Sequence, residues 1–305
     1  MRQSVFLAAL LAATANLFWA ANAIVGKAAI ASLPAFSLSQ FRWLLAFIII
    51  APIGLPKLIK QWSWYRQHIV KLLLLSVLSV TFYNTLQYWA LEYTEPVKVG
   101  AMLALMPLSI SLVSGFLGGR KQTLLEWLTS AVAVFGALMV VTDGRPFSVF
   151  SGHTAGIGEL LMVLAILSWA CYSVLFKSLP HASIHMLGIL TFFIGVGMLF
   201  ILPFWLYDVM TETVYLPSGA LWWSIVFVAI FPSIISFMCW NSAVKLGDAT
   251  IAGLMVTSAP LFNALLSILF LHATISAVQW LGIAIVVVGV AATLLLSRRT
   301  VTVIS

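Results

Sequence analysis

Long apolar runs, separated by short segments that contain glycine, proline or charged residues, recur ten times along the chain. They cover residues 5–31, 38–53, 69–90, 99–117, 124–141, 157–179, 186–207, 221–244, 250–271 and 277–296. Most of them approach the roughly 20 residues that a helix needs to cross a bilayer. Residues 72–75 and 283–290 lack the alternation of polar and apolar positions that is typical of a membrane β-barrel. The pattern therefore predicts an all-α integral membrane protein with ten transmembrane helices.

The composition narrows the class of protein further. The 305-residue chain is 63% hydrophobic and 8% charged, which leaves too few polar side chains to cover a water-soluble surface. Ten helices would use about 200 residues, and the remainder suffices only for connections and tails. The composition therefore excludes a soluble enzyme, and we expect no separate aqueous domain.

The distribution of charge indicates an orientation in the membrane. The chain has 15 Lys and Arg against 8 Asp and Glu, a net charge of +7. With a cytoplasmic N-terminus, only Lys27, Arg42, Lys98 and Arg145 fall toward the outer side, and the other basic residues fall inside. Because cytoplasmic loops are enriched in basic residues, we predict a multi-pass inner-membrane protein with both termini in the cytoplasm. Its environment is the lipid bilayer, and we expect no nucleic-acid partner.

Residues 1–23 imitate a cleavable signal peptide. Arg2 precedes an apolar stretch, and Ala21-Asn22-Ala23 resembles a cleavage site. The apolar run nevertheless continues to Ile30 and has a counterpart later in the chain. We therefore expect this segment to stay as the first transmembrane helix.

The sequence contains an internal repeat. A shift of 153 residues superposes Pro107 on Pro260, Trp127 on Trp280 and Gly136 on Gly289, and a shift of 150 superposes Trp19 on Trp169 and Lys27 on Lys177. The repeat predicts two five-helix units, residues 1–147 and 148–305. Because five is odd, the second unit enters the bilayer from the opposite side, so the two units form inverted repeats, an arrangement that suits alternating access.

The repeated positions carry a resemblance to a known family. They are joined by Phe41-Arg42 in the second run and by Ala90-Leu91-Glu92-Tyr93-Thr94 before the fourth. Over nearly its whole length the chain resembles the EamA family of the drug/metabolite transporter superfamily. The resemblance implies a ten-helix inner-membrane carrier, in a family whose members often export amino acids or other metabolites. Many relatives carry a Glu-Arg pair after the fourth helix of each half, where this chain has Gly119-Arg120-Lys121 and His272-Ala273-Thr274.

Polar side chains inside the bilayer are costly unless they face the bundle interior, so they are the candidates for contact with a substrate. Helical spacing places Asn16 with Trp19 and Lys27 on one face, and Asn84 with Gln87 and Tyr88 on another. Helix eight offers a third such face at Ser233, Ser236 and Trp240. Together they indicate a cavity lined by aromatic and amide groups. The candidate substrate-binding residues are Asn16, Trp19, Lys27, Tyr83, Asn84, Gln87, Tyr88, Trp169, Tyr172, Trp240 and Asn263.

These residues also allow structural interpretations. Trp and Tyr are enriched at membrane interfaces, and Asn or Ser often bonds a neighbouring helix. Lys27 either extends its charge to the interface or receives a substrate carboxylate. Arg42 has the same two alternatives, which the sequence leaves open.

Three further residues are candidates for proton coupling or for helix bending. Glu159 begins the sixth run and is either a solvated helix end or a proton-coupling carboxylate, and no carboxylate falls at mid-membrane. Facilitated diffusion or exchange is therefore a credible alternative to proton coupling. Pro107 and Pro260 are predicted to kink the fourth and ninth helices at equivalent positions, as hinges or as static bends.

We therefore predict a transporter that moves small amphipathic metabolites, amino acids or related compounds, by alternating access. The resemblance favours export; a metabolite or vitamin importer and a drug exporter of the same fold are the alternatives. The five His residues are scattered, so we expect no enzyme, no metal site and no cofactor. A membrane-embedded enzyme or a scaffold is a remote alternative, and the protein could act as a monomer or dimer.

Overall fold

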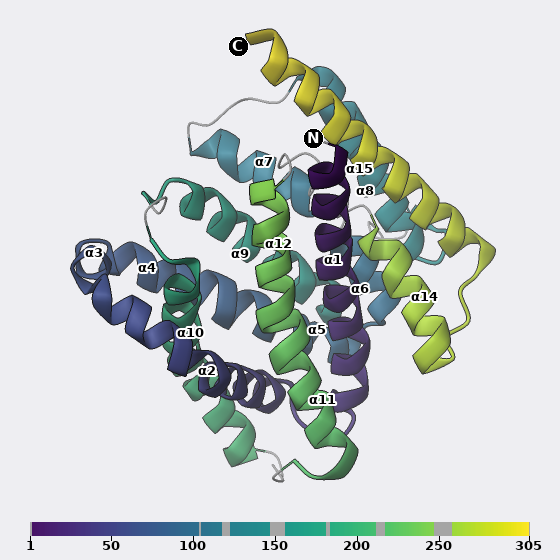
Figure 1. Ribbon diagram of the computed structural model, residues 1–305. Helices are drawn as coiled ribbons and strands as arrows, with labels where there is room; N and C mark the ends of the chain where they lie inside the picture. The colour runs from purple at the N-terminus through teal and green to yellow at the C-terminus, as the bar shows by residue number, and fades with distance from the viewer. Residues whose placement is uncertain are drawn as a thin grey trace.

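The computed structural model describes residues 2–103, 105–117, 123–146, 156–180, 184–211, 217–246 and 258–304. In these residues the secondary structure is helical, without a strand (Figure 1). The first half of the chain contains α1 (Arg2–Ile30), α2 (Ala35–Lys60), α3 (Trp62–Gln67), α4 (Ile69–Ser76), η1 (Val77–Tyr83), α5 (Asn84–Tyr93), α6 (Pro96–Leu103), α7 (Met106–Phe116) and α8 (Leu124–Val141). The second half contains α9 (Ile157–Lys177), α10 (Met186–Thr211), α11 (Gly219–Ile230), η3 (Phe231–Ile235), α12 (Ser236–Leu246), α14 (Ala259–Leu271) and α15 (Ala277–Ile304). The predicted unit boundary at residues 147 and 148 lies outside the described residues.

Six described segments are long and apolar enough to cross a membrane: Phe6–Ile30, Ala35–Lys60, Ile69–Tyr93, Ile157–Phe176, Met186–Thr211 and Gly219–Trp240. A seventh arises if α6 and α7, which are bent by 44° relative to each other, form one broken span. Shorter apolar helices at Trp127–Val141, Ala259–Leu271 and Ala277–Ala292 coincide with the other three predicted runs. The fold is therefore that of a multi-pass helical membrane protein, while the count of ten spans stays a prediction.

The helices of the two halves pack reciprocally. α1 contacts α11, η3 and α12 of the second half, and α9 contacts η1 and α5 of the first half. In the same way, α2 contacts α11 and η3, while α10 contacts α4 and η1. Figure 1 shows α1 beside α12 in the middle of the bundle, with both chain ends toward the same upper edge. Each half therefore contributes its first two helices to the middle segments of the other.

α8 and α15 show this reciprocity at single residues. A Cβ atom on Gly136 would lie 2.7 Å from the backbone nitrogen of Val286, and one on Gly289 would lie 2.6 Å from that of Ala133. A shift of 153 residues exchanges these two contacts. Because both glycines face backbone atoms, they permit the close helix approach that small residues allow in membranes.

Two π-helical turns also fall at matching places. η1 spans Val77–Tyr83 and η3 spans Phe231–Ile235, and a shift of 153 residues carries the first across the second. A π turn contains an extra residue per turn, and such turns are frequent at functional sites. η1 leads directly into Asn84 of α5, and η3 contains Ser233. The turns therefore position two polar side chains near the middle of their spans.

Candidate functional site

Arg42 is the centre of a buried polar cluster. It lies on α2, about 10 Å along the axis from the first residue Ala35, and its side chain is 2% exposed. Its Nε donates to Oγ of Ser233 at 2.7 Å, and its Nη1 donates to Oδ1 of Asn84 at 3.0 Å and to the hydroxyl of Tyr88 at 2.8 Å. Its Nη2 has no recorded hydrogen bond among the described residues. A guanidinium from the first half thus meets side chains from both halves.

Each neutral partner of Arg42 is itself held in place. The Tyr88 hydroxyl donates to Oδ1 of Asn22 at 2.6 Å, and Nδ2 of Asn84 donates to the Ser79 carbonyl at 2.8 Å. Oγ of Ser233 donates to the carbonyl five residues earlier, at 2.7 Å. The oxygen atoms that accept from Arg42 are therefore fixed toward it.

The charge of Arg42 is offset by dipoles rather than by an opposite charge. The ion pair recorded among the described residues joins Lys98 to Asp143 at 3.7 Å, and none is recorded for Arg42. The guanidinium carbon also lies 4.7 Å from the ring centre of Trp43 and 5.5 Å from that of Tyr88, within the range of cation–π attraction. Burial of an ion costs several kcal/mol, which such contacts offset only in part. The site therefore retains an attraction for an anion.

Two aromatic groups lie next to this cluster. Nε1 of Trp19 donates to the Pro232 carbonyl, one residue before Ser233, at 3.1 Å, and the rings of Trp19 and Trp240 are 5.6 Å apart. The first group is thus adjacent to Arg42. The second group joins Tyr83 to Trp169 at 4.7 Å and Trp169 to Tyr172 at 5.0 Å.

The structure brings some of the predicted site residues together and separates others. Asn84 and Tyr88, which share a helix face, contact Arg42, and their contact with a substrate stays a prediction. Asn16 donates to the Ala12 carbonyl of its own helix at 2.9 Å. Asn263 donates within its helix to the Ala259 carbonyl at 3.1 Å, and its side chain packs over the Cα of Gly100. Gln87 is buried on α5, with no recorded bond to the cluster among the described residues.

Lys27 has different neighbours from Arg42. Its Nζ donates to the carbonyls of Leu91 and Thr94 at 2.6 and 3.1 Å, where α5 ends at Tyr93. The last carbonyls of a helix lack intrahelical partners and carry partial negative charge. The structure thus places the Lys27 ammonium at a helix terminus, away from the recorded contacts of Arg42.

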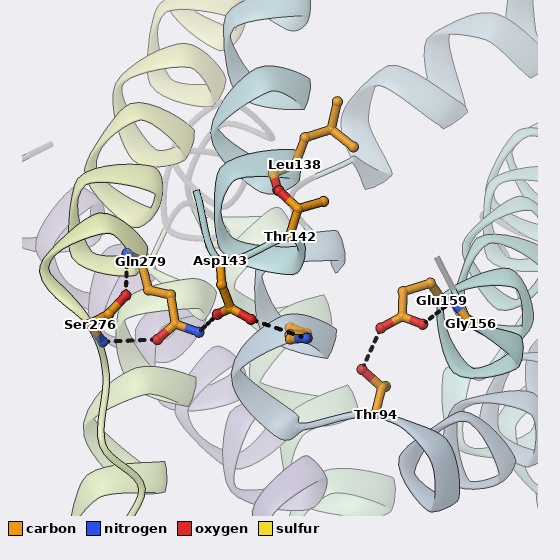
Figure 2. Close-up of polar contacts among 9 residues, drawn as sticks. Thr94, Leu138, Thr142, Asp143, Gly156, Glu159, Ser276 and Gln279 are labelled. Atoms are coloured by element: carbon orange, nitrogen blue, oxygen red, sulfur yellow. Dashed lines mark hydrogen bonds and ion pairs between the residues drawn. The ribbon is translucent and has the colours of Figure 1, made fainter. Parts of the chain in front are cut away.

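Glu159 also serves a helix terminus. Its Oε1 accepts from Oγ1 of Thr94 at 2.7 Å and its Oε2 from the Gly156 backbone N–H at 3.0 Å, at the start of α9 (Figure 2). Figure 2 shows a separate network beside it, in which Nε2 of Gln279 donates to Oδ1 of Asp143 at 2.6 Å. Both carboxylates are engaged in contacts between helix ends.

The predicted kink prolines begin helices. Pro107 lies in the first turn of α7, after the break from α6, and Pro260 lies in the first turn of α14. Proline is well tolerated there because the first helical N–H groups have no intrahelical partner. Among the described residues, no three His, Cys, Asp or Glu side chains are grouped so that they could hold a metal ion.

Sequence reasoning missed part of the cluster. In the sequence, Asn22 stands out only as part of a signal-like triplet, although it lies one turn from Trp19 on the same helix. Arg42 was left ambiguous, because the sequence does not say what opposes it. Arg42 lies four residues from the start of its apolar run (38–53) and Lys27 four residues from the end of its run (5–31), so position within a run did not distinguish them.

The fold and the cluster together define a class: a multi-pass helical membrane protein with a charged and aromatic centre inside the bundle. The chain belongs to the EamA-like transporter family, whose family model matches residues 6–142 and again residues 156–295. The family and relatives are named as transporters, not as enzymes.

Two individual relatives are also named as transporters. The chain is 27% identical over 293 residues to the uncharacterized transporter YetK of Bacillus subtilis (strain 168), covering 91% of this chain and 84% of that protein. It is 26% identical over 217 residues to the aromatic amino acid exporter YddG of Ancylobacter novellus, covering 71% and 73%. A solved crystal structure with a TM-score of 0.65 and 23% identity covers 96% of this chain and 98% of its own, which shows a shared fold.

Proposed function

We propose that this protein carries small amphipathic solutes with a carboxylate group, foremost amino acids with apolar side chains, across the cytoplasmic membrane. Transport proceeds by alternating access, in the direction of export. The observation that carries this proposal is the buried Arg42 guanidinium, whose recorded partners are all neutral.

A solute carboxylate supplies the negative charge that the neutral partners of Arg42 lack. Charge-assisted bonds between guanidinium and carboxylate are shorter and stronger than neutral ones, and the planar guanidinium suits a two-point contact. Nη2 is the nitrogen through which this contact forms without breaking the bonds to Asn84, Tyr88 and Ser233. The solute's charge therefore binds at α2.

The apolar part of the solute has a neighbouring surface. Trp19 and Trp240 lie beside the cluster through the contact of Trp19 with the Pro232 carbonyl. Solute sites in proteins combine aromatic walls with a few placed polar groups. This arrangement favours an amphipathic solute over a small inorganic anion.

We further propose that residues 1–147 and 148–305 are inverted five-helix repeats. Support comes from the two family matches, the reciprocal packing of α8 with α15, and the matching positions of η1 and η3. Inverted repeats give two conformations of similar energy, open to opposite sides. Export is supported by the name of one relative, and cytoplasmic termini by the distribution of Lys and Arg.

Transport of a panel of solutes tests the carboxylate. Purified protein in liposomes is loaded with phenylalanine, and exchange against labelled phenylalanine is measured with competitors. We expect competition by phenylalanine and 3-phenylpropionate, which carry a carboxylate, and none by phenethylamine, which lacks it. Arg42→Gln should lower exchange by roughly tenfold or more, whereas Lys27→Gln should retain it. Equal competition by phenethylamine would contradict the proposal.

Cysteine labelling in intact cells tests the inverted arrangement. Cys171 and Cys239 are replaced by Ala, and a single cysteine is placed at Ser32, after α1, or at Ser178, after α9. Inverted repeats require opposite sides, so an impermeant maleimide should label position 32 from outside and position 178 only after permeabilisation. Labelling of both from one side would remove the inversion.

A further inference from the structure

Asp208 is a buried carboxylate that joins the two halves. It lies near the end of α10 and is 3% exposed. Its Oδ2 accepts from the Ser37 backbone N–H at 2.7 Å and from the Ser37 hydroxyl at 3.0 Å. Glu92, Glu95 and Asp143, in contrast, are exposed, and Glu159 is half-buried. Among the carboxylates whose side chains the structure describes, Asp208 is the buried one.

The partner of Asp208 lies on the helix that carries the site. Ser37 is the third residue of α2, so its N–H is one of those that a helix leaves unpaired, and it attracts negative charge. Arg42 follows five residues later, about 7.5 Å along the same axis. A contact made at Ser37 therefore fixes the position of α2 relative to α10 close to the guanidinium.

We propose that Asp208 is a proton-binding residue, and that its protonation releases α2 from α10 and opens the bundle at this end. This role of Asp208 rests on the proposed function in one respect, namely that opening gives a solute access to Arg42. The ligand is a single proton, taken up by the carboxylate when the contact breaks and lost again when the contact forms.

The physical reason is the change of charge at the helix terminus. An ionised carboxylate makes charge-assisted bonds to the Ser37 N–H and hydroxyl, and these are about twice as strong as neutral ones. One added proton removes the negative charge that the start of α2 attracts, while a neutral carboxyl is tolerated in apolar surroundings. By linkage, proton uptake and separation of the helices favour each other.

Besides Asp208, the described elements packed against α2 and α10 carry charged or titratable side chains, among them Glu92, Tyr88 and Tyr93 of α5. α2 carries Arg42, with Lys57 and Lys60 at its far end; η1 carries Tyr83, and α10 itself carries Tyr207. Lys71 of α4 donates to the Ser178 hydroxyl at 2.6 Å, at the other end of the bundle.

Glu92 provides a matched control for Asp208. Its Oε1 accepts from the Ala35 N–H at 3.2 Å, at the start of the same helix. It differs in being exposed and in belonging to α5 of the first half, so its bond to α2 does not cross between the halves. Neutralising Glu92 changes the charge near the start of α2 without touching the contact with α10.

The test measures opening directly, without a solute. In protein with Cys171→Ala and Cys239→Ala in nanodiscs, a cysteine replaces buried Ala35, and a second protein carries the cysteine at exposed Ser32. The ratio of maleimide labelling rates at the two positions corrects for thiolate formation. We expect this ratio to rise about fivefold or more from pH 8 to pH 5, as the open population grows. A ratio that does not change with pH would overturn the proposal.

Two carboxylate variants locate the proton. Asp208→Asn should give a high ratio at every pH, whereas Glu92→Gln should keep the pH response. A wild-type response in Asp208→Asn, or its loss in Glu92→Gln alone, would overturn the proposal. Should Asp208→Asn fail to fold, Ser37→Ala serves instead: it removes one bond to Oδ2, so the midpoint of the response should move to higher pH, and an unmoved midpoint contradicts the proposal.

Exchange of labelled phenylalanine by the same protein variants in liposomes separates the two proposals. A pH-dependent labelling ratio without exchange supports the role of Asp208 and contradicts the proposed solute. Exchange together with a constant ratio supports the solute and overturns the role of Asp208.

Discussion

The Arg42 cluster has an apolar counterpart in the other half of the molecule. α2 and α10 each contain 26 residues, 151 positions apart, with Pro52 and Pro203 at the same place, so Arg42 corresponds to Phe193. The shifts of 150 and 153 residues pair three other members of the cluster with apolar or aromatic residues, while Tyr88 falls on Asn241. Asn22 corresponds to Tyr172, Asn84 to Phe237 and Ser233 to Val80.

The counterpart is an ordinary packed core. Val80, Tyr172 and Phe193 are buried in one apolar cluster, against which Phe237 packs. The ring centres of Tyr172 and Phe193 lie 6.0 Å apart in an edge-to-face arrangement, where the first half has Asn22 near Arg42. The same backbone arrangement thus holds a charge in one half and a hydrophobic core in the other. Duplication supplies the scaffold, and the positions where the two copies differ in polarity mark the site.

The largest effect is expected from the apolar side of this comparison. Phe193→Ala removes a buried ring and should lower the free energy of unfolding by about 3–5 kcal/mol, through lost packing. Exchange per folded molecule should stay near wild type, because Phe193 packs in the apolar cluster and is outside the proposed solute site. Thermal unfolding in detergent and exchange in liposomes measure the two. A stable variant that no longer transports would place the site in the wrong half.

Arg42→Met should give the opposite result. Loss of the charge removes hydrogen bonds worth about 1.5–3 kcal/mol to a bound carboxylate, which corresponds to a roughly 10- to 150-fold loss of exchange. The unfolding temperature should stay equal or rise, since a buried ion is replaced by an apolar chain. Unimpaired exchange would show that the polar half is structural.

Tyr88→Phe sharpens the comparison within the polar half. The hydroxyl bridges Arg42 and Asn22, so its removal loses two hydrogen bonds. The bond to Asn22 is worth about 0.5–1.5 kcal/mol and the bond to the charged guanidinium about 1.5–3 kcal/mol. We expect a partial loss of exchange, smaller than for Arg42→Met. Ser39→Ala, which removes a hydroxyl paired with Thr85 at 3.0 Å on the same two helices, is the control and should leave exchange unchanged. An equal loss in both variants would indicate general loosening of α2 from α5.

Tyr65→Phe should have the smallest effect. This phenol is buried in α3, between two spans, and no hydrogen-bond partner is recorded for its hydroxyl. Burial raises its pKa from 10.0 to about 12. Burial favours the neutral phenol in the folded state. The contribution of Tyr65 to the free energy of unfolding is therefore complete below pH 10 and is lost as the pH rises toward 12. The variant should be as stable as wild type at pH 7 and should lack this loss of stability at alkaline pH. Unfolding measured at pH 7 and 11 checks both. Impaired exchange in this variant would show that a buried polar group without charge also contributes to transport.

The sequence allowed prediction of where the helices occur but not of which helix faces contact each other. Each long described span falls on a predicted apolar run, because hydrophobic length is a local property. Asn84 and Tyr88 were assigned to one face by helical spacing, which is also local. Whether that face meets Arg42 depends on which helices are neighbours, and spacing within one helix contains no such information. Lys27 and Arg42 therefore looked alike in sequence, although one caps a helix and the other lies at the centre.

The π-helical turns impose a constraint on how the chain winds as well as on composition. A π turn accommodates one extra residue locally, so deletion of one residue within Val77–Tyr83 would restore regular winding and leave the direction of the following side chains nearly unchanged. Straightening of the turn at unchanged chain length would instead rotate Asn84 and Tyr88 by about 100°, away from α2, with every side chain of the cluster still present in the sequence. Homologous proteins that keep these residues and the chain length but wind this segment as a regular α-helix should therefore differ in the solutes they recognise.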